Sequence, residues 1–140
     1  MKQIFMMVML LFLTGCTSIE TVDTSAHIKT SEVVEALKNH QIDATLAEYK
    51  GIGIFISQLN GEKPDVYEFN QNWLVIYEFD TPEEREKGGT EFANKMLSTD
   101  APSYKSFVRR NIFLIYVHGE DAQVSLETQI QEALDSLIEG

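Results

Sequence analysis

Few side chains in this 140-residue sequence occur at the spacings typical of catalytic or metal-binding sites. The three histidines, His27, His40 and His118, share no HxxxH or HxH spacing, and no paired cysteines accompany them, so the sequence predicts no metal site. No Gly-x-Ser-x-Gly motif marks a nucleophilic serine. The two glycines of Gly51-Ile52-Gly53 are not followed by the third glycine of a nucleotide-binding loop. We therefore expect no catalytic, metal-ligating or cofactor-binding residue and no cofactor.

Two groups of charged residues leave alternatives open. Glu68 and Glu78 lie on expected strands, where they either face each other, which would raise the pKa of one, or both point to solvent. Arg109 and Arg110 place two adjacent positive charges in an acidic sequence. They form either a solvated turn or a site that binds an anion. The acidic run Glu83–Glu86 suits the positive end of a helix dipole and needs no cation to explain it.

The one strong nucleophile is the thiol of Cys16, and its position is informative. It follows an unbroken apolar run, Ile4–Leu13, which is preceded by Lys2 and followed by Thr14 and Gly15. Ten residues rise about 15 Å as a helix, half of the roughly 30 Å of a hydrocarbon core. The run therefore predicts a secretory signal peptide at residues 1–15 rather than a membrane span.

Leu13-Thr14-Gly15-Cys16 resembles the lipobox of bacterial lipoproteins. The resemblance implies a diacylglycerol (palmitate-type) thioether on Cys16, cleavage between Gly15 and Cys16, and a lipid anchor at the extracytoplasmic face of the cell membrane. It leaves open whether the amino group of Cys16 is acylated. The alternatives are an uncleaved anchor and a buried helix with an incidental cysteine.

Composition indicates how the rest of the chain is organised and which partners its charge favours. Residues 16–29 are rich in Ser and Thr and predict a flexible tether, and residues 30–140 have the length of a single domain. Loss of residues 1–15 removes one charge, that of Lys2, so the net charge changes from −11 to −12. Such a charge disfavours nucleic acid. It either serves solubility alone or favours a cationic protein or peptide as partner.

Local patterns predict the first elements of this domain. Thr30 or Ser31 can cap a helix that starts at Glu32 and ends near residues 39–41. Residues 50–57 alternate isoleucines with smaller residues and predict a strand. Asn60-Gly61 predicts a tight turn.

Two ββα units follow. Residues 72–77 (NWLVIY) align with residues 111–116 (NIFLIY), each after an extended run and before a helical pattern. The similarity indicates either a duplicated ββα unit or two strands made alike by similar burial. We predict an α+β fold, an antiparallel sheet of about four to five strands with helices in the order α-(β)-ββα-ββα. Its last helix should bury a stripe from Ile130 to Ile138.

The helix over residues 81–97 carries the clearest local signals. Thr81 is the expected N-cap, with Pro82 at the first helical position. Gly88-Gly89 inside this helix costs roughly 2 kcal/mol relative to alanines. The pair is explained by close approach to the sheet, by a kink, or by a notch for a partner.

The order of these segments resembles a group of small Firmicute (Bacillus-type) lipoproteins over residues 30–138. The resemblance rests on PDVYEF followed by WLVIYEFD, the TPEE helix start and the NIFLIYV strand. These motifs are structural, so they imply fold and location and bring no active-site residue. We expect a membrane-anchored, non-catalytic binding or envelope-interaction domain. The alternative is a small surface enzyme that acts on cell-wall material.

Overall fold

The computed structural model describes residues 26–51, 53–119 and 123–138. Cys16 and the Gly15-Cys16 cleavage position lie outside these residues. In chain order the elements are α1 (Thr30–Asn39), β1 (Thr45–Leu46), the 3-10 helix η1 (Gly53–Ile56), β2 (Asp65–Phe69), β3 (Asn72–Glu78), α2 (Pro82–Met96), β4 (Tyr104–Arg109), β5 (Ile112–Val117) and α3 (Val124–Ser136).

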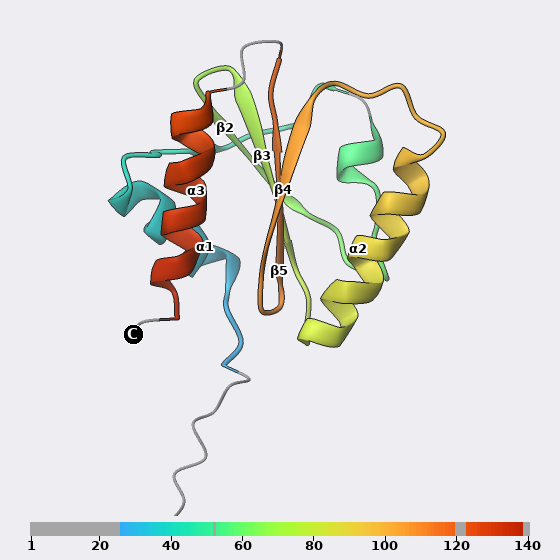
Figure 1. The fold of residues 1–140 in the computed structure, drawn as a ribbon, viewed down its shortest axis with the longest axis horizontal. Coiled ribbons are helices and arrows are strands. Elements are labelled where there is room, and N and C mark those ends of the chain that lie inside the picture. Colours follow the sequence, from blue (N-terminus) through green and yellow to red (C-terminus); the bar gives the residue numbers. More distant parts are fainter. Residues whose placement is uncertain (1–25, 52, 120–122, 139–140) are drawn as a thin grey trace, which may run out of the picture.

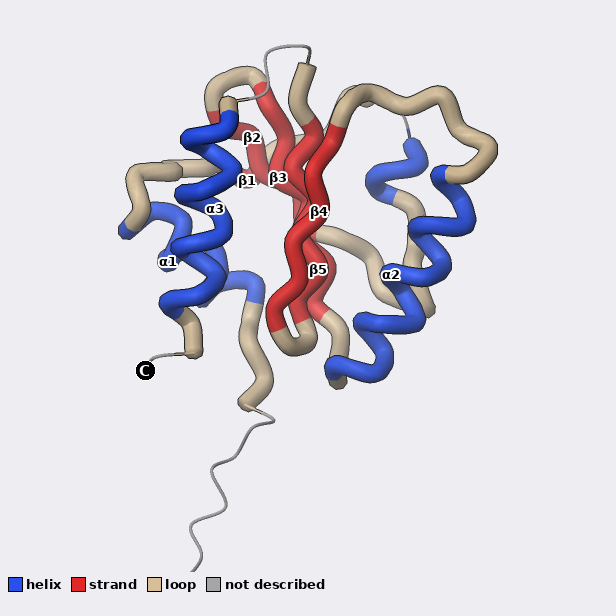
Figure 2. The backbone as a smooth tube through the Cα atoms, in the orientation of Figure 1, coloured by secondary structure: helices blue, strands red, loops and turns tan. Residues whose placement is uncertain are grey.

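The five strands form one antiparallel sheet in the order β1-β2-β3-β5-β4, which confirms the predicted α+β class. Helices α1 and α3 cover one face of the sheet, and α2 and η1 cover the other (Figure 1). The backbone trace shows the sheet as a central layer between these two helical layers (Figure 2). No helix in the described part of the chain is both long and apolar enough to traverse a bilayer.

Strands β3 and β5 are the centre of the fold because they are buried on both faces. Alternate side chains point to opposite faces, so their continuous apolar sequence supplies two separate cores. The core under α1 and α3 takes its sheet side chains from Leu74, Ile76, Ile112, Leu114 and Tyr116. The core under α2 takes Val75, Tyr77, Phe113, Ile115 and Val117.

This arrangement decides between the two explanations of the repeated sequence. Tyr77 lies in the core under α2, whereas its aligned counterpart Tyr116 lies in the core under α1 and α3. The two ββα units place their helices on opposite faces of one sheet (Figure 1). They therefore have opposite handedness, which a copied three-dimensional unit would not have. Similar burial of β3 and β5 explains the similar sequences.

The strand predicted over residues 50–57 is wrong, and the segment contains η1 instead. Phe55 is fully buried, and the Tyr77 hydroxyl lies 2.9 Å from its carbonyl oxygen and 2.7 Å from that of Ser57. Burial raises the pKa of Tyr77, so its hydroxyl stays protonated and able to donate. This tertiary contact fixes a backbone turn that the alternating isoleucines could not reveal.

The turn predicted at Asn60-Gly61 is confirmed. Asn60 and Gly61 have φ values of 44° and 86° and close a small bridge between Leu59 and Glu62. The β2–β3 hairpin turns at Asn70 and Gln71, both with positive φ. Two-residue hairpin turns need such left-handed conformations, so asparagine and glycine mark them in the sequence.

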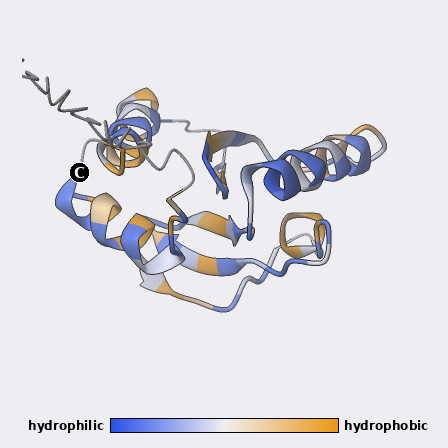
Figure 3. Cartoon of the chain, turned by 90° about the horizontal axis from the view of Figure 1, so that it is seen from below, coloured by the Kyte–Doolittle hydropathy of each residue, from blue (hydrophilic) through white to orange (hydrophobic). Residues whose placement is uncertain are grey.

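Helix α2 confirms the cap at Thr81 and explains Gly88. The Thr81 hydroxyl accepts a hydrogen bond from the Glu84 N–H at 3.2 Å. A Cβ on Gly88 would lie 2.4 Å from Cζ of Phe79, so glycine permits close approach to the sheet, whereas a Cβ on Gly89 would meet nothing within 4 Å. Most of α2 is hydrophilic (Figure 3).

The last helix fits its prediction except at one end. Ile130, Ala133 and Leu134 are buried, but Ile138 is 37% exposed. Helix α3 ends at Ser136, two residues earlier, so the 3.6-residue period no longer places Ile138 against the sheet.

Candidate functional site

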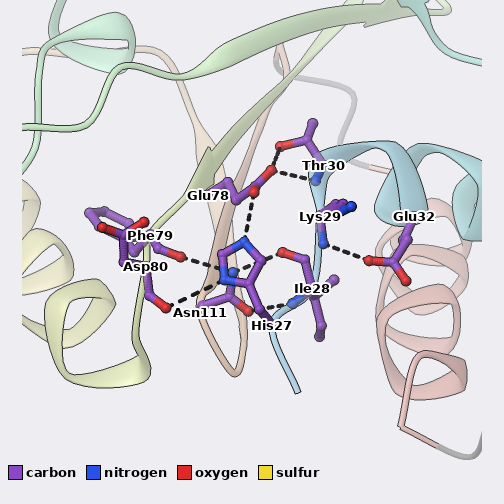
Figure 4. A network of polar contacts seen from close by, with 9 residues as sticks. All are labelled: His27, Ile28, Lys29, Thr30, Glu32, Glu78, Phe79, Asp80 and Asn111. Carbon is purple, nitrogen blue, oxygen red and sulfur yellow. Dashed lines mark hydrogen bonds and ion pairs between the residues drawn. The ribbon is translucent and has the colours of Figure 1, made fainter. Parts of the chain in front are cut away.

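The segment that leads from the predicted anchor into the domain is held by Asn111, in the β4–β5 turn. The N–H of Ile28 donates to Asn111 Oδ1 at 2.8 Å, and the Asn111 amide donates back to the Ile28 carbonyl at 2.8 Å. The same amide donates to the Phe79 carbonyl at 3.0 Å (Figure 4). Asn111 is 1% exposed, so one buried side chain satisfies three backbone groups, two of Ile28 and one of Phe79, where β3 ends and β5 begins.

Glu78, the last residue of β3, holds the start of α1. Its Oε2 accepts hydrogen bonds from the Thr30 N–H at 2.7 Å and the Thr30 hydroxyl at 3.0 Å. Helix N-termini have unpaired N–H groups and a positive dipole end, so a carboxylate there is stabilising. The prediction that Thr30 or Ser31 caps a helix beginning at Glu32 is therefore wrong. The helix begins at Thr30 with Lys29 as its N-cap residue, and the Glu78 carboxylate from the sheet accepts its first N–H.

His27 completes this network. Its Nε2 lies 2.8 Å from Glu78 Oε1, and because a carboxylate only accepts, Nε2 carries the hydrogen (Figure 4). Its Nδ1 lies 3.4 Å from the Asp80 carbonyl oxygen, which a protonated ring could also engage. We call His27, Ile28, Thr30, Glu78 and Asn111 the N-terminal latch.

The latch shifts the pKa values of its two titrating members. The hydrogen bond to Glu78 raises the pKa of His27, with smaller contributions from Asp80, and the partial burial of His27 opposes this. Burial raises the pKa of Glu78, but the hydrogen bonds from Thr30 and His27 outweigh it and leave that pKa lowered. The side chains of His27 and Glu78 are 38% and 33% exposed, so water moderates their attraction.

Two observations correct the boundary of the tether. Ile28 is 4% exposed in the core under α1 and α3, and the guanidinium of Arg110 donates to the Ala26 carbonyl at 3.2 Å. The tether predicted over residues 16–29 therefore ends before His27, because residues 27–29 have contacts with the rest of the domain that the absence of a secondary-structure period does not reveal. These residues belong to the folded body instead.

Arg109, the last residue of β4, and Arg110, in the β4–β5 turn, both make contacts within the chain. Arg109 lies 3.3 Å from Asp135 on α3, and the Arg110 carbonyl accepts from Arg85 Nε at 2.9 Å. Both side chains are half-buried, so the solvated-turn interpretation is incomplete. They hold α3, α2 and the N-terminal segment against one hairpin turn.

The remaining candidate residues do not come together. Glu68 pairs across the hairpin with Trp73, and Glu78 pairs with Ile112, so the two carboxylates do not face each other. His40 Nδ1 lies 2.8 Å from the Ala36 carbonyl, and His118 Nδ1 lies 2.8 Å from that of Gly119. No group of three or more His, Cys, Asp or Glu that could hold a metal occurs within residues 26–51, 53–119 and 123–138.

The described surface has shallow hollows. One of about 450 Å³ lies over α2, lined by Glu83, Glu86, Lys87 and Thr90. Another of about 270 Å³ lies between α1 and α3, where Glu32 and Glu35 contribute two acids and Ser136 and Leu137 form the other side. Neither contains the nucleophile, base and oxyanion donors that acyl transfer needs, and in each hollow the two acids lie on one helix and do not face each other across a cleft.

The comparisons with known proteins return no match. No protein-family model, no curated protein and no solved structure matches this chain.

Proposed function

We propose that the protein is a lipoprotein anchored through acyl chains on Cys16 to the extracytoplasmic face of the cell membrane. In this proposal its domain is a non-catalytic binding or envelope-interaction module. The bilayer is then its first partner, through the lipid, and a cationic protein or peptide is the second. The lipid type is a thioether-linked diacylglycerol, which supplies the two acyl chains that stable anchoring requires.

The observation that carries the proposal is the position of Cys16. It is the only cysteine in the chain, and it ends a Leu13-Thr14-Gly15-Cys16 motif directly after an apolar run too short to span a bilayer. A single thiol has no partner for an intramolecular disulfide. Acylation explains the thiol, the apolar run and the small residues before it together.

The N-terminal latch supports an anchoring role because it sets the length of the tether. With His27 onwards fixed to the domain, residues 17–26 remain between lipid and fold, and they reach about 33 Å when fully extended. The latch also fixes which end of the domain the tether leaves, beside the β4–β5 turn and the start of α2 (Figure 1). That end of the domain then carries the attachment to the lipid.

The charge supports a binding role with a cationic partner. A net charge of −12 after cleavage repels anionic headgroups and favours basic ligands at modest salt concentration. A cell-wall hydrolase, the alternative, would require two carboxylates across a cleft. Glu68 and Glu78 do not form such a pair.

Metabolic labelling with a radioactive fatty acid tests the anchor. The wild-type chain should be labelled and should sediment with membranes, and Cys16→Ser should lose both properties. Thr17→Ser, which changes the next residue and leaves the thiol, is the matched control and should behave as wild type. Persistent labelling of Cys16→Ser would refute the assignment.

An affinity purification from membranes with the acylated protein tests the binding role. We expect a basic protein or peptide that elutes as salt is raised. Recovery of no partner, together with turnover of cell-wall material by the purified protein, would favour the enzyme instead.

A further inference from the structure

The longer free edge of the sheet is β4. The sheet ends at β1 on one side, with two residues, and at β4 on the other, with the six residues Tyr104–Arg109. Figure 2 shows β4 at the front of the sheet with no helix or loop drawn across it. An open edge of this length presents unpaired backbone donors and acceptors, which a further strand can take up.

The hydrogen-bond pattern shows which residues of β4 are free. The His118 N–H donates to the Ser103 carbonyl at 3.0 Å, so Ser103 and His118 form a hydrogen-bonded pair. In an antiparallel ladder such pairs alternate with non-bonded ones. It follows from the register that Tyr104, Ser106 and Val108 direct their N–H and C=O groups away from β5.

Two of these three residues also expose apolar side chains at this edge. Tyr104 is 37% exposed and Val108 is 49% exposed, two of the large apolar side chains left at the surface. They lie on the same face of β4, with the smaller Ser106 between them.

We infer that β4 is a self-association edge, at which two copies of this chain join antiparallel about a two-fold axis that passes between their Ser106 residues. In this register Ser106 pairs with Ser106, and Tyr104 of each copy pairs with Val108 of the other. In each copy, the outward N–H and C=O groups of Tyr104, Ser106 and Val108 then hydrogen-bond to the residue that lies opposite in the other copy. A single ten-stranded sheet results.

Neighbouring registers are poorer for physical reasons. A shift by two residues in one direction places Lys105 of one copy directly opposite Lys105 of the other. A shift by two residues in the other direction places Lys105 of one copy opposite Arg109 of the other. Like charges directly opposite each other in a sheet are destabilising, whereas an aromatic residue opposite a β-branched one is stabilising. Only the register centred on Ser106 avoids both clashes and covers Tyr104 with Val108.

The occupant is a second copy because the edge complements itself. A two-fold axis needs one patch that matches its own image, and the Tyr104–Val108 pairing has that property. The contact consists of one strand pair, so it should be weak in dilute solution and stronger where many copies share a membrane.

Disulfide trapping tests the register. The test uses the full chain with Cys16→Ser, in mild detergent at millimolar concentration, so that an introduced cysteine is the only thiol and no lipid anchor is needed. Directly paired Cα atoms lie about 5.5 Å apart, within disulfide range, so Ser106→Cys should oxidise to a covalent dimer. Val108→Cys is the matched control, because two Val108 residues would lie about 14 Å apart.

We expect at least about tenfold more dimer from Ser106→Cys than from Val108→Cys under the same oxidation, because only the former meets the distance limit. Equal yields, or no dimer from a folded Ser106→Cys chain, would overturn the inference. Failure of lipidation does not affect this result, since the tested chain lacks Cys16.

A proline substitution separates self-association from folding. Ser106→Pro removes an N–H that faces away from β5, so the fold should persist by circular dichroism. The same chain should be monomeric by light scattering at concentrations where Ser106→Ala is dimeric. A Ser106→Pro chain that dimerises as well as Ser106→Ala would contradict β4 pairing, as would a monomeric Ser106→Ala chain.

Discussion

Glu78 at the end of β3 caps helix α1 through Thr30, 48 residues earlier in the chain, with its carboxylate 2.7 Å from the Thr30 nitrogen. The sheet thereby fixes where the first helix begins. The same carboxylate bonds His27, so helix start and N-terminal segment share one acceptor.

Glu78→Gln should therefore destabilise the fold by about 1–2 kcal/mol, because the amide loses the charge that faces the helix N-terminus and retains one acceptor atom. Urea unfolding followed by circular dichroism measures this. Glu68→Gln, at an exposed position of β2, is the control and should stay within about 0.5 kcal/mol of wild type. Equal losses in the two variants would argue against the cap.

The His27–Glu78 pair predicts a pH window for stability. The pKa of His27 is raised from 6.5, so its contribution is full below about 6.5 and is lost as pH rises through the folded-state pKa. The pKa of Glu78 is lowered from 4.5, so its contribution is full above about 4.5 and is lost as pH falls through the folded-state pKa. The pair therefore stabilises most between these values.

Unfolding of wild type and His27→Gln at a series of pH values checks this window. Both side chains are about a third exposed, so the difference should stay below about 1 kcal/mol. It should be largest near pH 5.5 and shrink towards about pH 8. A difference that grows with pH would show that the charged pair is not the cause.

Gly88→Ala should destabilise the protein by about 1–3 kcal/mol, although alanine is the better helix former, because its Cβ would overlap the Phe79 ring. Gly89→Ala is the matched control, one residue away with open space at its Cβ, and should gain about 0.5–1 kcal/mol. Thermal unfolding of the two variants should shift in opposite directions. A shared direction would mean that helix propensity alone decides.

Asn111→Ala should release the N-terminal segment. It leaves the N–H and C=O of Ile28 and the carbonyl of Phe79 without their side-chain partner, at a cost of about 2–4 kcal/mol. Trypsin should then cut after Lys29 faster than in wild type. Asn72→Ala, at the aligned position of the other hairpin, loses only a bond to the Tyr116 hydroxyl and should leave cleavage at Lys29 unchanged.

The sequence predicted what local chemistry determines. The Thr81 cap and the Asn60-Gly61 turn involve residues one to three apart, so propensity and spacing reveal them. The apolar runs of residues 72–77 and 111–116 predicted strands for the same reason, and the structure has β3 and β5 there.

The latch could not be read in the same way. Ile28 and Asn111 are 83 residues apart, and nothing local marks either as a partner. The η1 segment shows the opposite failure, since local alternation predicted a strand that the distant Tyr77 hydroxyl holds as a turn. The handedness of the two ββα units likewise depends on which face each helix takes, and a residue period carries no such information.

The residues of the sheet that the N-terminal latch contacts determine how a force applied to the N-terminal segment would be transmitted through the domain. The segment is hydrogen-bonded to Asn111, directly before β5, and to Glu78, the last residue of β3, so it is held where these neighbouring central strands begin and end. Tension would enter through Arg110 and Asn111 in the β4–β5 turn and through Glu78 at the end of β3, so the two central strands would share it. A domain tethered to a moving envelope would then resist being peeled open from its edge.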